Sequence, residues 1–179
     1  MPSKKSIRIV LTGPESSGKT TLAKALAKYY GVDLVPEFAR QYLNEKGPSY
    51  SFNDLEIMAE GQQFLEKEFL ERDNDLLICD TDILTYKIWS EYKYGYIEPN
   101  FISVLKKNTD RLYLLCAPDI PWESDPLREN SLDRSDIFSL YEENLDFYNL
   151  NYIRIEGGLE QRIKDAIFAI QKFSQLNIH

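Results

Sequence analysis

Apolar residues along this chain fall into short continuous runs that alternate with longer stretches in which they recur every three or four positions. The short runs are typical of strands buried on both faces of a parallel sheet, and the periodic stretches are typical of amphipathic helices. The strand-like runs are residues 7–12, 32–35, 76–80, 111–116 and 152–155. Five strands that alternate with helices predict a parallel sheet with helices on both faces.

The periodic stretches between these runs predict helices that pack on the sheet. They cover residues 21–30, 37–43, 132–150 and 159–173, a long stretch from residue 53, and two segments broken near Gly95 and Pro99. Asn53, with Glu56 three residues later, resembles a capping box that begins the long helix. The apolar side chains expected to point inward from this helix are Leu55, Met58, Phe64, Leu65 and Phe69.

Length and composition limit the class of protein. With 179 residues, of which 43% are hydrophobic, the chain is expected to fold as one domain over residues 1–179 with a sizeable core. No apolar run approaches the ~18 residues of a membrane-spanning helix, so no membrane partner is expected. The net charge of −8 argues against nucleic-acid binding, because a phosphate backbone attracts a basic surface.

The cysteines and the single histidine narrow the chemistry further. Cys79 and Cys116 lie inside apolar runs and offer neither a disulfide framework nor metal-ligand spacing. The basic start leads into the first strand without the apolar region of a signal peptide, so a cytoplasmic protein is expected. His179 is the last residue, which excludes histidine-based acid–base chemistry in the body of the fold.

The loop between the first predicted strand and the first predicted helix carries the clearest motif. Its sequence, Gly-Pro-Glu-Ser-Ser-Gly-Lys-Thr at residues 13–20, fits the phosphate-binding pattern G-x-x-x-x-G-K-[ST] in the strand–loop–helix context that the pattern requires. The glycines let successive N–H groups face one concavity, to which the helix adds the positive end of its dipole. The residues expected to bind the triphosphate of ATP are Gly13, Glu15, Ser16, Ser17, Gly18, Lys19, Thr20 and Thr21.

Two side chains of this motif have distinct expected roles. Lys19 would reach the β- and γ-phosphates, and Thr20 would give its hydroxyl to Mg²⁺. With the alternating strands and helices, the motif predicts a three-layer α/β P-loop NTPase fold of the nucleoside and nucleotide kinase type. Ligands in such folds gather outside the carboxyl ends of the strands, so charged residues that follow the predicted strands are candidates for the site.

Two carboxylates follow the third predicted strand. Asp80 ends this apolar run, at the position of a Walker B aspartate that holds Mg²⁺ directly or through water. The alternative is a solvated carboxylate at the end of a strand. Asp82 lies two residues further, so one carboxylate can serve the metal while the other accepts hydrogen bonds from a substrate hydroxyl.

Glu37 follows the second predicted strand, and a doubly wound sheet brings it to the same edge as Lys19. A carboxylate there can orient an acceptor hydroxyl or take its proton. Because phosphoryl transfer depends mostly on positioning and charge stabilisation, the orienting role comes first. The spacing is equally typical of a glutamate that the dipole favours at a helix N-terminus. Arg40, one turn later, would bind substrate or pair with Glu37.

Residues 119–136, a polar segment interrupted by prolines together with the start of the next helix, are predicted to form a lid. Arginines in the lids of small P-loop kinases neutralise the transferring phosphoryl group while the lid excludes water. Arg128 and Arg134 suit that role, although loop arginines are often simply solvated. Trp122 has no obvious core to fill, which favours stacking on a flat ring, whereas Trp89 lies on an apolar helical face and is expected in the core.

Several segments together resemble the kinase domain of NadR-type proteins, in the order of that family and over nearly the whole chain. They are the motif at residues 13–20, Glu37-Phe38-Ala39-Arg40, Gly61-Gln62, Asp80-Thr81-Asp82-Ile83-Leu84-Thr85 and Pro121-Trp122-Glu123-Ser124-Asp125-Pro126-Leu127-Arg128. Many ATPases share the first motif, whereas the Glu-x-Ala-Arg, Asp-Thr-Asp and Trp-x-x-Asp-x-Leu-Arg segments are much narrower.

This resemblance implies ribosylnicotinamide kinase activity in NAD biosynthesis. With ATP and Mg²⁺, such an enzyme phosphorylates the 5′-hydroxyl of nicotinamide riboside to give nicotinamide mononucleotide. The resemblance also implies that Trp122 stacks on the nicotinamide ring and that Asp82 or Glu37 faces the ribose hydroxyls. Arg128 and Arg134 would belong to the lid.

The sequence also departs from the family. Pro126 stands where the family often has glycine, which is expected to stiffen the lid. The helix-turn-helix and adenylyltransferase domains of full-length NadR have no counterpart in this sequence, so DNA binding and dinucleotide synthesis are not expected. Two alternatives are a kinase for another nucleoside or small alcohol and a regulatory ATPase; the acidic pair and the lid segment favour a kinase.

Overall fold

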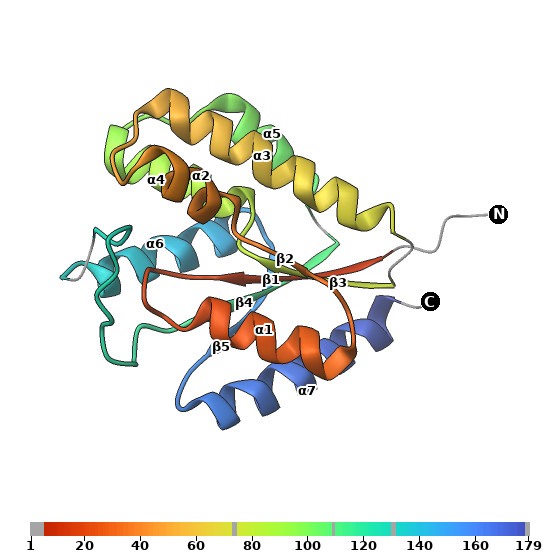
Figure 1. Ribbon diagram of the computed structural model, residues 1–179. Coiled ribbons are helices and arrows are strands. Elements are labelled where there is room, and N and C mark those ends of the chain that lie inside the picture. The colour runs from red at the N-terminus through yellow and green to blue at the C-terminus, as the bar shows by residue number, and fades with distance from the viewer. Residues whose placement is uncertain (1–5, 73–74, 109, 130–131, 178–179) are drawn as a thin grey trace.

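A five-stranded sheet separates two layers of helices in the computed structural model, which describes residues 6–72, 75–108, 110–129 and 132–177. The strands are β1 (Ile7–Thr12), β2 (Leu34–Val35), β3 (Leu76–Asp80), β4 (Arg111–Cys116) and β5 (Asn151–Ile155). They run parallel in the order β2-β3-β1-β4-β5 (Figure 1). The predicted doubly wound parallel sheet is therefore confirmed.

Helices cover both faces of the sheet (Figure 1). One face packs against α1 (Lys19–Tyr30) and α7 (Leu159–Asn177), which form one hydrophobic core with it. The other face forms a second core with the remaining helices. Those helices are α2 (Phe38–Lys46), α3 (Phe52–Leu70), α4 (Ile83–Tyr94), α5 (Pro99–Leu105) and α6 (Arg134–Phe147). Because both faces are covered, all six residues of β4 are buried, as its continuous apolar run predicts.

The strand register brings the carboxyl ends of the central strands to one edge. Leu11 near the end of β1 pairs with Asp80 at the end of β3 and with Leu114 of β4. The segments that follow these strands therefore emerge together: the glycine loop after β1, the start of α4 after β3, and the polar segment after β4. This edge is where ligands bind in parallel sheets.

The start of α3 differs from the prediction. Ser51, not Asn53, caps the helix: its hydroxyl accepts a hydrogen bond from the Asp54 N–H, and the Asp54 carboxylate accepts one from the Ser51 N–H at 2.8 Å. Aspartate replaces the usual glutamate in this capping box. Phe64, predicted to point inward, is 61% exposed. It lies two positions after the buried Gln62, about 200° around the helix, and so on the outer face.

Other boundaries shift by a few residues. The second strand is shorter than predicted and begins at Leu34. Helix α6 begins at Arg134, and Leu132 before it is exposed.

Both cysteines are free and fully buried. Burial raises the pKa of the Cys116 thiol to about 12. Within the described ranges, no helix combines the length and apolar character needed to cross a bilayer.

Candidate active site

The loop after β1 has the backbone conformation that its glycines permit. Gly13 and Gly18 have φ angles of 130° and 80°, which residues with a Cβ atom rarely adopt. A Cβ atom on Gly13 would lie 2.6 Å from the Cys116 carbonyl oxygen, so the neighbouring strand also requires glycine there. Gly18 is the N-cap of α1, so the loop leads directly into the positive end of the helix dipole.

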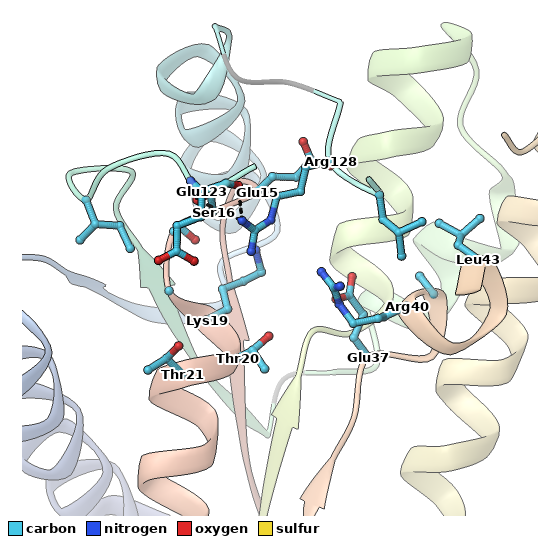
Figure 2. Close-up of a pocket in the computed structure, with 15 residues that line it drawn as sticks. Glu15, Ser16, Lys19, Thr20, Thr21, Glu37, Arg40, Leu43, Glu123 and Arg128 are labelled. Atoms are coloured by element: carbon cyan, nitrogen blue, oxygen red, sulfur yellow. Dashed lines mark hydrogen bonds between the residues drawn. The ribbon is translucent and has the colours of Figure 1, made fainter. Parts of the chain in front are cut away.

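Lys19 is folded back over this loop. Its Nζ donates hydrogen bonds to the carbonyl oxygens of Gly13 at 2.9 Å and Pro14 at 2.7 Å. Figure 2 shows the Lys19 side chain beside Thr20 and Thr21, on one side of a cavity of about 170 Å³. Seven of the eight residues predicted to bind the triphosphate line this cavity: Glu15, Ser16, Ser17, Gly18, Lys19, Thr20 and Thr21.

Thr20 and Asp80 form the part of the site that suits a magnesium ion. The Thr20 hydroxyl donates a 2.6 Å hydrogen bond to Oδ2 of Asp80. The other oxygen of Asp80, Oδ1, is buried and has no hydrogen-bond partner. Burial raises the pKa of Asp80, while the Thr20 hydrogen bond and the Lys19 charge oppose that rise.

These two side chains fit the way proteins hold Mg²⁺ with nucleotides. The ion usually takes one or two carboxylates, together with phosphate oxygens and water, rather than a full set of protein ligands. Within the described residues, no group of three or more His, Cys, Asp or Glu side chains suited to a metal occurs. A hydroxyl and one orphaned carboxylate oxygen are therefore an adequate protein contribution.

Glu37 lies on the opposite side of the cavity, as the N-cap residue of α2. Figure 2 shows its carboxylate and the Arg40 guanidinium facing the side that carries Lys19 and Thr20. Surrounding protein atoms raise the pKa of Glu37, and the negative charge of Asp80 raises it further. The sheet thus brings Glu37 and the phosphate loop to one edge.

The position of Glu37 depends on a contact from α3. The Gln62 side chain accepts a 2.8 Å hydrogen bond from the Phe38 N–H and donates one to the Pro36 carbonyl at 3.3 Å. It therefore fixes the backbone on both sides of Glu37. The ring of Phe38 packs where a Cβ atom of Gly61 would lie, so that position requires glycine. These contacts give the Gly61-Gln62 segment a physical role.

The polar segment after β4 lies against the phosphate loop. Arg134 donates 3.1 Å hydrogen bonds to the carbonyl oxygens of Ser16 and Ile120, and Arg128 Nη1 lies 3.4 Å from Ser16 Oγ. The Glu123 N–H also donates to Ser16 Oγ, at 2.9 Å. Both predicted lid arginines thus reach the loop that would hold phosphates. Residues 130 and 131 of the predicted lid lie outside the described residues.

An ion pair joins the two sides of the cavity. Arg40 of α2 contacts Asp125 of the lid at 2.9 Å, rather than pairing with Glu37. On the other side, the N–H of Glu129 donates to the Glu15 carboxylate at 3.0 Å. The lid is therefore held both by α2 and by the phosphate loop.

Asp82 does not face the cavity, and this part of the prediction is wrong. Its side chain is fully buried and caps α4 by accepting a 3.0 Å hydrogen bond from the Leu84 N–H. Its second oxygen accepts hydrogen bonds from Arg111 at 2.9 Å and from the Tyr113 hydroxyl at 2.7 Å. With both oxygens occupied inside the fold, Asp82 positions the start of α4.

Trp122 is also placed differently from the prediction. Its ring lies against two guanidinium groups, with centroid distances of 6.0 Å to Arg128 and 5.7 Å to Arg134. Among the described residues, those that line the cavity do not include Trp122. Trp89 instead lines a smaller adjoining cavity of about 70 Å³, together with Tyr50, Tyr86 and Glu37. Aromatic side chains therefore lie on the Glu37 side of the site.

Sequence reasoning missed Arg162 of α7. This buried side chain donates hydrogen bonds to the carbonyl oxygens of Ser17 at 2.7 Å and Ala117 at 3.0 Å, and it pairs with Asp119. It therefore holds the phosphate loop to the segment that leads into the lid. A single arginine in a helix carries no sequence signal for such a role.

The glycine loop, the sheet order and the lid define a P-loop protein with the fold of nucleoside and nucleotide kinases. A family model described as an AAA domain matches residues 8–162, and the chain belongs to this family. It is 26% identical over 154 residues to the "Trifunctional NAD biosynthesis/regulator protein NadR" of Escherichia coli (strain K12). This match covers 83% of the chain and 38% of the relative, so the chain spans well under half of that protein.

Solved structures share the fold. NadR in complex with NR has a TM-score of 0.76 at 20% identity, covering 94% of this chain and 51% of that one. NadR in complex with NAD and AMP-PNP has a TM-score of 0.80 at 20% identity, covering 97% and 51%. Thymidylate kinase from Candida albicans has a TM-score of 0.67 at 14% identity, covering 94% and 92%.

Proposed function

We propose that this protein is an ATP-dependent kinase that phosphorylates the 5′-hydroxyl of nicotinamide riboside, giving nicotinamide mononucleotide. The observation that carries the proposal is the position of Glu37, across one cavity from Lys19 and Thr20; Glu37 and Thr20 also line a second cavity, together with Asp80. A carboxylate opposite a triphosphate site suits an acceptor hydroxyl better than a nucleotide-binding switch, which needs no such group. The similarity to NadR, which has been solved with NR, supports the choice of acceptor.

The triphosphate of ATP would lie in the loop at residues 13–20. Lys19 would exchange the Gly13 and Pro14 carbonyls for phosphate oxygens, while the loop N–H groups bind the β-phosphate. Thr20 and Asp80 would hold Mg²⁺, which neutralises charge on the phosphates when bound. Arg128 and Arg134, already directed at Ser16, would stabilise the transferring phosphoryl group.

The acceptor would enter from the side of α2. Glu37 would accept a hydrogen bond from the 5′-hydroxyl, hold it in line with the γ-phosphate and take its proton. Arg40 would contribute from the same helix to acceptor binding and, through Asp125, to the position of the lid. The proximity of Trp89 to Glu37 favours this tryptophan over Trp122 as the neighbour of a flat base.

The test is ADP formation that depends on the riboside. Purified protein with ATP and Mg²⁺ is expected to form ADP and nicotinamide mononucleotide only when the riboside is added. Lys19→Ala should lower this rate by about 10²- to 10³-fold, because it removes a charge that stabilises the transition state. If ATP turnover were the same with and without the riboside, the acceptor would be wrong.

A panel of other acceptors tests the two alternative functions, a kinase for another nucleoside or small alcohol and a regulatory ATPase. Faster turnover with another nucleoside or a small alcohol would retain the kinase and replace its substrate. Tight nucleotide binding without transfer to any acceptor would identify a regulatory ATPase. Trp89→Ala and Trp122→Ala form a matched pair within the panel, since the chain has only these two tryptophans. Trp89→Ala should raise the acceptor KM more than the ATP KM, and more than Trp122→Ala does.

A further inference from the structure

Leu127 is an apolar side chain within the polar lid. It is half-buried and packs against the core on the side of the sheet that α2, α3 and α4 cover. Leu132, five residues later in the same segment, is 93% exposed. The lid therefore contacts the rest of the fold through an apolar side chain as well as through the ion pair of Arg40 with Asp125.

The turn that carries Leu127 is tied to α2. Oδ1 of Asp125 accepts a 2.9 Å hydrogen bond from the Leu127 N–H, and the Asp125 carbonyl oxygen accepts one of 3.0 Å from the Arg128 N–H. Oδ2 of the same carboxylate pairs with Arg40. The two oxygens of one carboxylate thus link the backbone of Leu127 to the helix that begins directly after Glu37.

Leu127 lies where two cavities meet. It lines the cavity of the phosphate loop and also the smaller one of about 70 Å³ that contains Tyr50, Tyr86 and Trp89, here called the aromatic cavity. Figure 2 shows Glu37 and the α2 residue Leu43 on the side opposite the phosphate loop. The residues common to both cavities are Glu15, Glu37, Ala39, Leu43 and Leu127. Of the lid residues that the structure describes, Leu127 is the one that lines the aromatic cavity.

We infer that Leu127 is an acceptor-binding residue supplied by the lid, which covers the flat base of the acceptor in the aromatic cavity. The inference rests on the proposed kinase function, in which the acceptor hydroxyl lies at Glu37 and its base near Trp89. The acceptor gains this apolar contact only while the lid is closed, so the acceptor holds the lid over the phosphate loop. A closed lid keeps water from the γ-phosphate. One side chain therefore couples acceptor binding to the protection of ATP from hydrolysis.

Steady-state kinetics separates this contact from a merely structural role. Leu127→Ala should raise the riboside KM by about tenfold, because a few apolar groups in a binding pocket change affinity by at least this factor. The ATP KM should stay nearly unchanged. The variant should also release more phosphate to water per ADP formed. Leu127→Met keeps an apolar side chain of similar volume and should restore both values. Leu132→Ala is the matched control, since this exposed leucine should affect neither.

The outcomes distinguish this inference from the proposed function. An unchanged riboside KM in Leu127→Ala, or equal rises in the riboside and ATP KM values, would overturn the inference and retain the kinase. Thermal unfolding without ligands checks that each variant folds, and Leu127→Asn, a polar side chain of similar size, should raise the riboside KM as well. If the wild-type protein used another acceptor from the panel, the same variants are measured with that acceptor. If it used none, the proposed function and this inference would both be wrong.

Discussion

The carboxyl of Glu37 combines a position in the same cavity as Lys19 with an altered acidity. Burial and the charge of Asp80 raise its pKa above the ordinary value of 4.5. Activity that requires the ionised carboxylate should therefore rise with pH through a midpoint above 4.5, measured as kcat/KM of riboside phosphorylation. Glu37→Gln should lower kcat by about 10²-fold and remove this acidic limb. A variant that kept the same limb would exclude Glu37 as its source.

Asp80 requires a separate control, because burial raises its pKa as well. Protons and Mg²⁺ compete for Asp80. If Asp80 causes the fall in activity at low pH, added Mg²⁺ should therefore move that fall to lower pH, whereas a fall caused by Glu37 should stay in place.

The raised pKa values also affect stability, with a definite sign. Both carboxyls bind protons more tightly in the folded chain, so their contribution to stability is greatest below their unfolded pKa and is lost as pH rises through the raised values.

Asp82 should behave as a structural residue. Asp82→Asn leaves Arg111 and Glu66 in the interior with one negative charge fewer, and breaking a buried ion pair costs roughly 3 kcal/mol. We expect this loss in the free energy of unfolding by urea, with the riboside KM of the folded variant nearly unchanged. A large rise in KM at unchanged stability would instead restore the substrate-facing role.

The residues found from sequence share one property: a local pattern marks them. The phosphate loop has a fixed spacing, and Glu37 and Asp80 directly follow apolar runs, whose ends meet at one edge of a parallel sheet. The surroundings of Asp82 depend on Arg111 and Tyr113 of β4, which local spacing cannot reveal. The contacts of Trp122 depend likewise on how the lid folds back over the loop.

At the level of elements, the cap of α3 offers a direct test. Ser51→Ala removes the hydroxyl that accepts the Asp54 N–H and should destabilise the protein by about 1 kcal/mol. Asn53→Ala is the matched control: Asn53 lies inside the helix and caps nothing, so its replacement should change stability little. Urea unfolding of both variants measures the difference. Equal losses would place the helix start two residues later.

The boundaries of this helix explain where sequence patterns are ambiguous. Ser51 with Asp54 and Asn53 with Glu56 have the same spacing, and the second pair carries the more usual glutamate. Tertiary packing decides between them, because Asp54 also bonds the Tyr42 hydroxyl at 2.6 Å and pairs with Lys46, both on α2. The helices and strands themselves could be predicted, since each buries a face over many residues.

For the whole molecule, nucleotide binding should appear as added stability. At a concentration of AMP-PNP and Mg²⁺ about 100 times the Kd, binding adds about 2.7 kcal/mol, which corresponds to a rise of roughly 5–10 °C in Tm. Asp80→Asn should retain the rise due to AMP-PNP alone and lose the increment due to Mg²⁺. Scanning calorimetry with and without the metal measures both. An increment that survived in the variant would remove Asp80 as a metal ligand.

The parallel sheet also explains how much of the overall architecture could be predicted. Alternation of buried runs and amphipathic stretches is sufficient for the class of fold, because few arrangements cover both faces of such strands. The order of the strands and the path of the lid are set by contacts between distant segments. Arg162 shows this dependence, since one side chain of the last helix holds the first loop and the segment after β4.

The two buried thiols have a practical consequence for observing the lid. Neither is accessible, and the raised pKa values of Cys79 and Cys116 leave almost no thiolate at neutral pH. Maleimide dyes should therefore ignore the native chain and label a cysteine introduced at the exposed Ser124 or Glu45. A donor and an acceptor dye at these two positions would report, by energy transfer, whether the distance between this segment and α2 changes when nucleotide and riboside are added.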